Sequence, residues 1–410
     1  MTVANETRPG ARRWWMLVRG FLSQNVTIGC SYGTFGISMI GLQERYDAGR
    51  GAISLGFSLV ILGMGLLGPL ISRAVERFGF RRTMMIGVVL AGSGYALLAS
   101  SSHIVAFFIA FGFLIGPGVA MAGTLPVGLM VGDWFPEWRG RAVGLATMPV
   151  LLTFMPMLGV LLIEELELGG FYTIVSVLHF SLLAVILGIR GTPVRRARPD
   201  GPAQHEGVSE SGPVKGPAMR IVRRPIFWLL VLSGGILNAV SITGVANIVS
   251  LLIEQGTSPA RAAMMASMMG AAAVCGTLGI GWLCDHLGGA RALALAALGL
   301  AGSWFALVLE PGFALTLGAL ILIGACGAGT FPAVTVISSR LFGLAQLGKA
   351  LGLFGLFTVP LTFALPPLAG WLHDATDGYP AVIAFIVAGC GVVAVNFVLL
   401  SRVERRSAVA

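Results

Sequence analysis

Long apolar runs alternate with short polar connections along the whole chain. A helix needs about 20 apolar residues to cross a hydrocarbon core about 30 Å thick. Twelve runs come close to that length or exceed it, at 20–42, 53–72, 83–100, 104–132, 142–163, 171–189, 226–253, 262–284, 292–309, 313–336, 350–372 and 381–401. The pattern therefore predicts an all-helical protein that crosses a membrane many times.

The basic residues are concentrated in alternate connections between the runs. The odd-numbered connections contain only Arg45, Arg50 and Arg261, three of the 27 Lys and Arg residues, whereas the acidic residues divide evenly between the two sides. Basic residues accumulate in the cytoplasmic loops of membrane proteins. We therefore expect a multi-pass protein of the cell membrane, the inner membrane in a bacterium, with both termini in the cytoplasm.

The composition narrows the class of protein further. A hydrophobic content of 56%, a charged content of 11% and a mean hydropathy of +0.87 exclude an ordinary soluble domain. The isoelectric point near 9.9 could indicate nucleic acid, but the basic residues form no continuous patch with interleaved aromatics. The five cysteines lie in or at the ends of apolar runs without metal-ligand spacing, which favours packing. The expected partners are the lipid bilayer and a small-molecule substrate, not nucleic acid, and no oligomer is required.

One polar segment, 190–225, separates six runs from six. It contains six prolines and eight basic residues among Gly and Ser, a composition typical of a flexible linker rather than a folded domain. We therefore expect an N-terminal six-helix bundle at 1–189, a cytoplasmic linker at 190–225 and a C-terminal six-helix bundle at 226–410.

The two halves repeat each other in sequence. The hexapeptide at 140–145, Gly-Arg-Ala-Val-Gly-Leu, returns at 348–353 as Gly-Lys-Ala-Leu-Gly-Leu. Leu-Thr-Phe at 152–154 returns at 361–363. Glu76 and Gly79, in the connection after the second run, return as Asp285 and Gly288. Six helices duplicated in parallel is an arrangement found in secondary transporters.

The loop at 72–82, Ser-Arg-Ala-Val-Glu-Arg-Phe-Gly-Phe-Arg-Arg, resembles the cytoplasmic signature of the major facilitator superfamily, Gly-x-x-x-Asp-Arg-x-Gly-Arg-Arg. It departs from that signature at Ser72, Glu76 and Phe80. The resemblance implies twelve transmembrane helices in two pseudo-symmetric six-helix bundles. It also implies a cytoplasmic gate in which a carboxylate interacts with helix N-termini and arginines, formed by Glu76, Arg77, Gly79, Arg81, Asp285 and Gly288. An ordinary positive-inside loop is the alternative interpretation.

Several further segments are similar to the monocarboxylate transporter branch of that superfamily. They are Ser31-Tyr32-Gly33, Gly68-Pro69, Trp134-Phe135 and the run from Pro366 to Asp374 with Gly378-Tyr379. The branch typically carries a Lys in helix 1 and an Asp and an Arg in helix 8, where this chain has Gly36, Ala273 and Thr277. The resemblance implies symport or uniport of a monocarboxylate or related organic anion. The missing charges favour a neutral or weakly anionic, partly apolar substrate.

The resemblance also implies that helices 1, 4, 7 and 10 line the substrate cavity. Small polar residues of the first run fall within one arc of a helix at about 100° per residue, namely Thr27, Cys30, Ser31, Thr34 and Ser38. They can line the cavity, or they can bond to their own helix and allow close helix packing. Further candidates, each also explained by packing, are Thr124, Thr330, Phe331 and Phe357.

The seventh run carries two polar pairs on different faces. Asn238 and Ser241 are one turn apart, and so are Thr243 and Asn247. An Asn amide in a membrane needs hydrogen-bond partners. One pair is expected to face the cavity and the other to stabilise helix contacts, and the sequence leaves open which is which.

His179 is the one imidazole well inside an apolar run. Ionisable groups within a membrane are functional candidates, which makes His179 a candidate proton site. Helix 6 is peripheral in the implied fold, however. A neutral imidazole bonded to a neighbouring helix is therefore the favoured interpretation.

The motifs of enzymes are missing from the sequence. It contains no Walker-type loop, no zinc spacing and no Ser/His/Asp set placed for catalysis, so we expect neither an enzyme nor a cofactor. The leading hypothesis is a secondary transporter of a small organic solute that works by alternating access. The alternatives are a facilitator or efflux pump for a neutral or apolar compound, and a transporter-like solute sensor.

Overall fold

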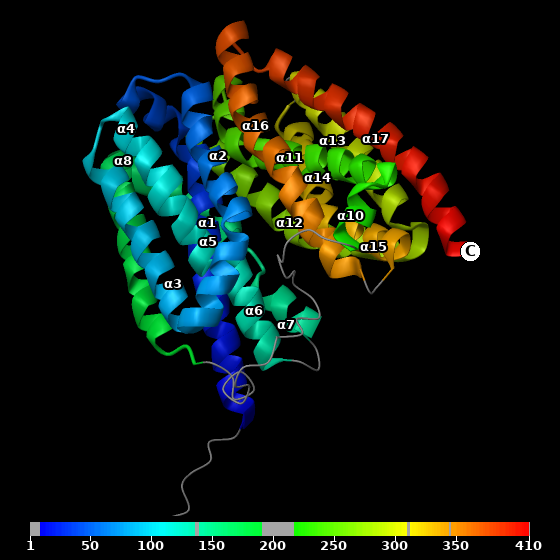
Figure 1. Cartoon of the computed structure of the whole chain (residues 1–410). Coiled ribbons are helices and arrows are strands. Elements are labelled where there is room, and N and C mark those ends of the chain that lie inside the picture. The colour runs from blue at the N-terminus through cyan, green and yellow to red at the C-terminus, as the bar shows by residue number, and fades with distance from the viewer. Residues whose placement is uncertain (1–8, 136–138, 191–216, 310–311, 344–345, 410) are drawn as a thin grey trace, which may run out of the picture.

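A computed structural model describes residues 9–135, 139–190, 217–309, 312–343 and 346–409, and every regular element in these ranges is a helix (Figure 1). The N-terminal half contains α1 (Pro9–Tyr46), α2 (Arg50–Leu66), α3 (Gly68–Ser100), α4 (Ile104–Ile109), the π-helix η1 (Ala110–Ile115), α5 (Gly116–Ala122), α6 (Thr124–Trp134), α7 (Arg139–Ala146) and α8 (Val150–Leu187). The C-terminal half contains α10 (Pro217–Val222), α11 (Pro225–Glu254), α12 (Pro259–Leu287), α13 (Gly289–Val308), α14 (Phe313–Gly327), α15 (Thr330–Phe342), α16 (Leu347–Thr376) and α17 (Pro380–Val409).

The twelve predicted runs correspond to these helices, although their boundaries differ. The fourth run is divided into α4, η1, α5 and α6, and Gly123 leaves the helical conformation between α5 and α6; the tenth run is divided into α14 and α15. The fifth and sixth runs join into α8 across a kink at Glu167. Eight helical stretches of the described chain are long and apolar enough to cross a membrane, and further apolar segments lie in α1, α2, α14 and α15.

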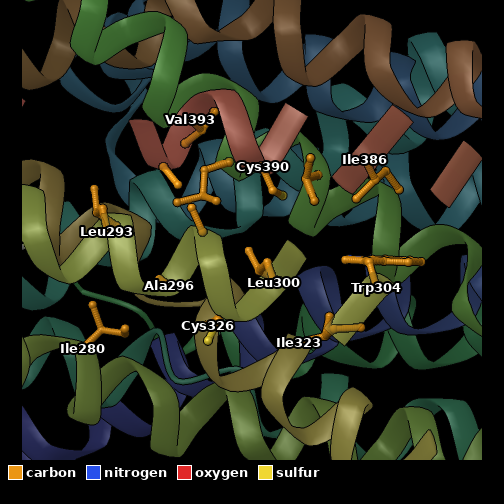
Figure 2. Packing of buried hydrophobic residues seen from close by; sticks show 14 of the residues in the cluster. Ile280, Leu293, Ala296, Leu300, Trp304, Ile323, Cys326, Ile386, Cys390 and Val393 are labelled. Atoms are coloured by element: carbon orange, nitrogen blue, oxygen red, sulfur yellow. The ribbon is translucent and has the colours of Figure 1, made fainter. Parts of the chain in front are cut away.

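Two separate sets of buried apolar side chains form the cores of two bundles. One set extends from Leu17 to Ile189 and, among the described residues, also includes Ala246 from the second half of the chain. The other extends from Ile221 to Leu400. Figure 2 shows part of the second core, in which Leu300 and Trp304 of α13 lie close to Ile386 and Cys390 of α17.

The repeat seen in the sequence returns in the backbone. Gly79 and Gly288 occupy matched positions after the second and eighth runs, with φ/ψ of 80°/162° and 88°/155°. Positive φ also recurs at Asp47 and Gly256, which follow α1 and α11. The two halves thus turn in the same way at matched loops, and this backbone conformation explains why glycine occupies both 79 and 288.

We name the two faces of the molecule by the ends of α1. The tail side is the face at which α1 begins, and the far side is the face at which α1 ends at Tyr46. The halves meet through α2 with α16, α1 with α11, and α8 with α12. Figure 1 shows the bundles side by side along α2 and α16.

Glycine permits close approaches of backbone to backbone between the halves. A Cβ at Gly36 would lie 2.8 Å from the Val245 carbonyl oxygen, and one at Gly370 would lie 2.7 Å from the Gly51 nitrogen. Both contacts lie within about 20 Å of the far-side helix ends, at 1.5 Å per residue. The halves are therefore packed together at the far side.

Glycine also governs packing inside the C-terminal bundle. A Cβ at Gly276 of α12 would lie 2.2 Å from the Ala325 carbonyl oxygen, and one at Gly324 of α14 would lie 2.0 Å from the Met269 carbonyl oxygen. Small residues at helix crossings are a main source of packing energy in membranes, because they allow backbones to touch.

We predict that Gly324→Ala destabilises the folded protein by about 1–3 kcal/mol, because the methyl group would force α12 and α14 apart. Gly318→Ala on the same helix is the matched control, since nothing lies within 4 Å of its Cβ position. Thermal unfolding of both purified variants in one detergent tests this. Equal melting temperatures would contradict the close crossing.

Candidate functional site

The face of α1 that looks toward the other half is identified by Gly36, which contacts α11. Tyr32 and Ile28 lie one and two turns away on the same face, and both are partly exposed whereas the other residues from Ser23 to Gly36 are buried. The Tyr32 ring packs edge-on against Phe57 of α2 at 5.1 Å between centroids. Its hydroxyl has only a weak contact of 3.8 Å with the Met64 sulfur. The phenol therefore keeps hydrogen-bonding capacity beyond this contact.

The predicted stripe of small polar residues on α1 points elsewhere. All of its members are buried in the N-terminal bundle, Cys30 among the apolar side chains of its core. Thr27 and Thr34 donate to carbonyls of their own helix, and the Ser31 hydroxyl pairs with the Tyr95 hydroxyl of α3 at 3.0 Å. Bonding to the helix itself and close packing, the second interpretation of the stripe, account for these residues.

The fourth run is broken where it passes α1. Gly123 leaves the helical conformation, with φ −92° and ψ −138°, and separates α5 from α6. Pro126 has no N–H to donate to the Ala122 carbonyl four residues earlier. Ser23 of α1 donates to that carbonyl instead, at 2.7 Å. The break is therefore stabilised by a side chain from the neighbouring helix.

Gln24 joins the same break to α1. Its amide nitrogen donates to the Thr124 hydroxyl at 3.1 Å, and Thr124 itself is exposed. The side-chain amide oxygen of Gln24, Oε1, is buried and has no protein partner. Gln24 and Thr124 thus form a polar pair at the start of α6 that retains an unpaired hydrogen-bond acceptor.

The tenth run repeats this break. Gly123-Thr124-Leu-Pro returns as Gly329-Thr330-Phe-Pro, and α15 begins at Thr330 as α6 begins at Thr124. Ser241 of α11 lies at this second break, with its hydroxyl 3.0 Å from the Leu237 carbonyl and 3.5 Å from the Gly327 carbonyl. Thr330 is buried and donates to the Gly327 carbonyl at 3.4 Å. The Phe331 side chain lies outside the described part of the structure.

The two polar pairs of α11 have different surroundings. Asn238 and Ser241 are partly exposed on the face that also carries Val245, the contact of Gly36. Asn247 is buried and donates to the Thr243 carbonyl at 3.0 Å, while Thr243 bonds to Ala239 in the same helix. The pair at 238 and 241 therefore faces the other half, and the pair at 243 and 247 belongs to the C-terminal bundle.

Two further candidates lie away from the facing sides of the bundles. The Phe357 ring packs on Trp228 at 4.8 Å, between α16 and α11. His179 is fully buried and its Nδ1 lies 2.8 Å from the Val175 carbonyl of its own helix. The expected bond to a neighbouring helix is replaced by ring contact with Tyr95 of α3, at 4.8 Å between centroids.

The predicted gate residues lie on the tail side. Glu76, Arg77 and Arg81 are exposed, and the guanidinium of Arg77 lies 5.4 Å from the Phe78 ring centroid. Gly79 and Gly288 share a backbone conformation with positive φ and extended ψ, while the Asp285 side chain lies outside the described part of the structure. Their role as a gate remains a prediction.

Tyr32 and Gln24 were missed as candidates by the sequence reasoning. The signal that could have found Gln24 is the Gly-Thr-x-Pro repeat, which marks two helix breaks that need polar partners from α1 and α11. Tyr32 had no such signal, because only the contact at Gly36 shows which face of α1 meets the other half.

Comparison with known proteins agrees with this architecture. The family model described as Major Facilitator Superfamily matches residues 21–249 and 231–410. The chain belongs to the major facilitator superfamily. Its members act as membrane transporters rather than enzymes, so a small-molecule substrate and a lipid environment follow from membership.

Individual relatives of this superfamily member differ in the substrate that they are named for. The chain is 25% identical over 374 residues to the 2-nitroimidazole transporter of Escherichia coli (strain K12), covering 89% of this chain and 90% of the relative. It is 25% identical over 418 residues to monocarboxylate transporter 12 of Rattus norvegicus, covering 94% and 85%. A bacterial homolog of the human lysosomal transporter Spinster, solved inward-facing and unoccupied, has a TM-score of 0.76 at 14% identity, covering 98% of this chain and 99% of that one.

We predict that a cysteine introduced at Ser241 reacts with a maleimide much faster than one introduced at Thr243. The first position is partly exposed toward the other half, whereas the second is buried between helices. The measurement is the labelling rate of both variants in detergent, in a background from which the exposed native Cys275 has been removed. Similar rates at both positions would show that the α11 faces are misassigned.

Proposed function

We propose that this protein is a secondary transporter that moves a small organic solute, a monocarboxylate or related organic anion, across the cell membrane by alternating access. The tail side is cytoplasmic, as the distribution of basic residues predicts. The observation that carries the proposal is the pair of Gly-Thr-x-Pro breaks in two repeat-related bundles, each contacted by a polar side chain from α1 or α11. Broken helices next to the facing sides of repeats are a feature of transporter binding sites.

The packing explains one departure from the monocarboxylate branch. Gly36 stands where that branch typically has a Lys, and a Cβ at this position would already lie 2.8 Å from the Val245 carbonyl. No side chain fits there while the far side is closed. A substrate must instead be held by neutral groups, for which Tyr32, Asn238 and the Gln24–Thr124 pair are placed.

Neutral groups can still favour a carboxylate. The start of α6 at Thr124 carries the partial positive charge of a helix N-terminus, next to the Gln24 amide. The same neutral lining favours the second candidate function, which is facilitated movement or efflux of a neutral, partly apolar compound. The similarity to a 2-nitroimidazole transporter supports that second candidate, and the similarity to monocarboxylate transporters supports the first.

Ligand screening and transport by the purified protein test the proposal. We expect thermal stabilisation and counterflow in proteoliposomes with at least one short-chain or aromatic monocarboxylate. Responses confined to neutral nitroaromatics would favour the second candidate, and binding without counterflow would indicate a sensor.

For the substrate found in this way, we predict that Asn238→Ala raises KM about three- to tenfold, the effect of one lost hydrogen bond. Thr243→Ala is the control, because its hydroxyl bonds within its own helix in the C-terminal bundle. An unchanged KM for the Asn238 variant would remove this residue from the site.

We also predict that Glu76→Gln slows counterflow while membrane insertion is unchanged. The exposed carboxylate lies in the loop that is expected to interact with helix N-termini when the cytoplasmic side closes. Counterflow rate per inserted molecule is the measurement. Unchanged flux would leave the loop as an ordinary positive-inside connection.

A further inference from the structure

A cluster of charged side chains closes the far side of the molecule, away from the candidate substrate site. We call it the far-side cluster, and its members are Arg50 of α2, Glu254 of α11, His373 and Asp374 of α16, and Tyr379 before α17. Arg50 comes from the N-terminal half and the other four from the C-terminal half. The cluster therefore joins the two halves at the face where they meet.

Arg50 is the centre of this cluster. Its side chain is only 7% exposed, and its guanidinium contacts the Glu254 carboxylate and the Tyr379 hydroxyl. The guanidinium carbon also lies 5.1 Å from the Tyr379 ring centroid. A nearly buried cation of this kind is stable only while its partners stay in place.

Asp374 caps α2 from the other half of the chain. Its carboxylate accepts from the backbone N–H groups of Arg50 at 3.2 Å and Gly51 at 3.1 Å. The residue before α2 is Gly49, which has no side chain for this purpose, and a Cβ there would lie 2.6 Å from an Asp374 oxygen. A helix N-terminus that is capped in this way loses its cap when the halves separate.

His373 lies between the two carboxylates. Its Nε2 is 3.2 Å from Glu254 and its Nδ1 is 3.5 Å from Asp374, and its side chain is 13% exposed. Its ring packs edge-on against Tyr379 at 4.7 Å between centroids. Each ring nitrogen thus faces a carboxylate, and a carboxylate can only accept a hydrogen bond.

The charges of the cluster balance only when His373 carries a proton. Burial raises the pKa of Tyr379, which therefore stays neutral and donates to the Asn247 carbonyl at 3.4 Å. The cluster then contains one guanidinium and two carboxylates, Glu254 bonded to the guanidinium and Asp374 to the backbone N–H of Arg50, and it carries a net charge of −1. A doubly protonated imidazole donates to both carboxylates and brings this charge to zero.

We propose that the far-side cluster is an exterior proton site that controls opening of the transporter. A proton bound at His373 holds the exterior side closed, and its loss at higher exterior pH releases the halves on that side. The inference rests on the proposed alternating access and on the proposed orientation. It adds an exterior proton as the ligand that shifts the equilibrium between the exterior-closed and exterior-open states.

Protonation is linked to the conformational equilibrium because the two ring nitrogens of His373 face the Glu254 and Asp374 carboxylates in the closed state. The closed exterior state is therefore favoured while His373 carries its proton and loses that advantage when the proton is lost. The proton enters and leaves on the same side, so it is not carried across. External pH should change the rate of transport without driving accumulation.

The test measures the separation of the halves directly. Spin labels are placed on the exposed far-side residues Ser102 and Ser258, one in each half, after removal of the native cysteines. We expect the population at the short, closed distance relative to the population at the long, open distance to fall about fivefold or more between pH 5.5 and pH 7.5, a typical coupling for one effector.

Substitutions assign the effect to one side chain. His373→Gln should abolish the pH dependence, because Gln has a similar size and does not titrate in this range. His103→Gln is the matched control, since His103 is an exposed far-side histidine outside the cluster and should leave the dependence intact. A flat response of the unsubstituted protein, or an equal response of the His373 variant, would overturn the proposal.

The distance measurement needs no substrate, so its outcome is separate from that of the proposed function. Proteoliposomes with the outer pH varied at constant inner pH give the functional counterpart. Accumulation of substrate driven by the pH gradient and lost in His373→Gln would contradict a proton that acts from one side only.

Discussion

The contact between the two bundles at the far side is the constraint on which the rest of the arrangement depends. It is made where glycine lets backbone meet backbone, at Gly36 against α11 and at Gly370 against α2. In a membrane the hydrophobic effect does not drive helices together, so such close packing and polar contacts must supply the attraction. The contact also brings α1 and α11 together, with Gly36 against Val245.

The breaks in the fourth and tenth runs both contain a proline, which cannot donate the backbone hydrogen bond of a continuous helix. Pro126 leaves the Ala122 carbonyl without its helical partner, and Ser23 from α1 supplies a donor. A carbonyl without a partner is costly in a membrane, so each break requires a polar neighbour. The same requirement brings Gln24 to Thr124, and at the second break Ser241 lies at Gly327. Structural need and binding capacity thus coincide on the facing sides of the bundles.

Charged side chains are distributed differently between the candidate substrate site and the far-side closure. The residues placed for a substrate are neutral, whereas the far-side closure combines Arg50 with two carboxylates and an imidazole. A polar closure can separate and be solvated, whereas a purely apolar seal would expose hydrophobic surface to water. Placing the charges at the closure leaves the substrate region free to accept solutes of low polarity.

The sequence alone was enough for the fold, because apolar run length, the sidedness of basic residues and the repeat between halves are one-dimensional signals. It also pointed to Gly79 and Gly288, which occupy matched positions and share a positive φ. It was not enough for the site. Thr27, Cys30, Ser31 and Thr34 have the polarity of cavity residues yet lie within the N-terminal bundle, because small side chains serve packing equally well. Only tertiary packing decided which face of α1 or α11 meets the other half, because helical periodicity fixes angles within a helix but not its rotation against its neighbours. Tertiary packing also brought Arg50 to Glu254, some 200 positions away in the sequence.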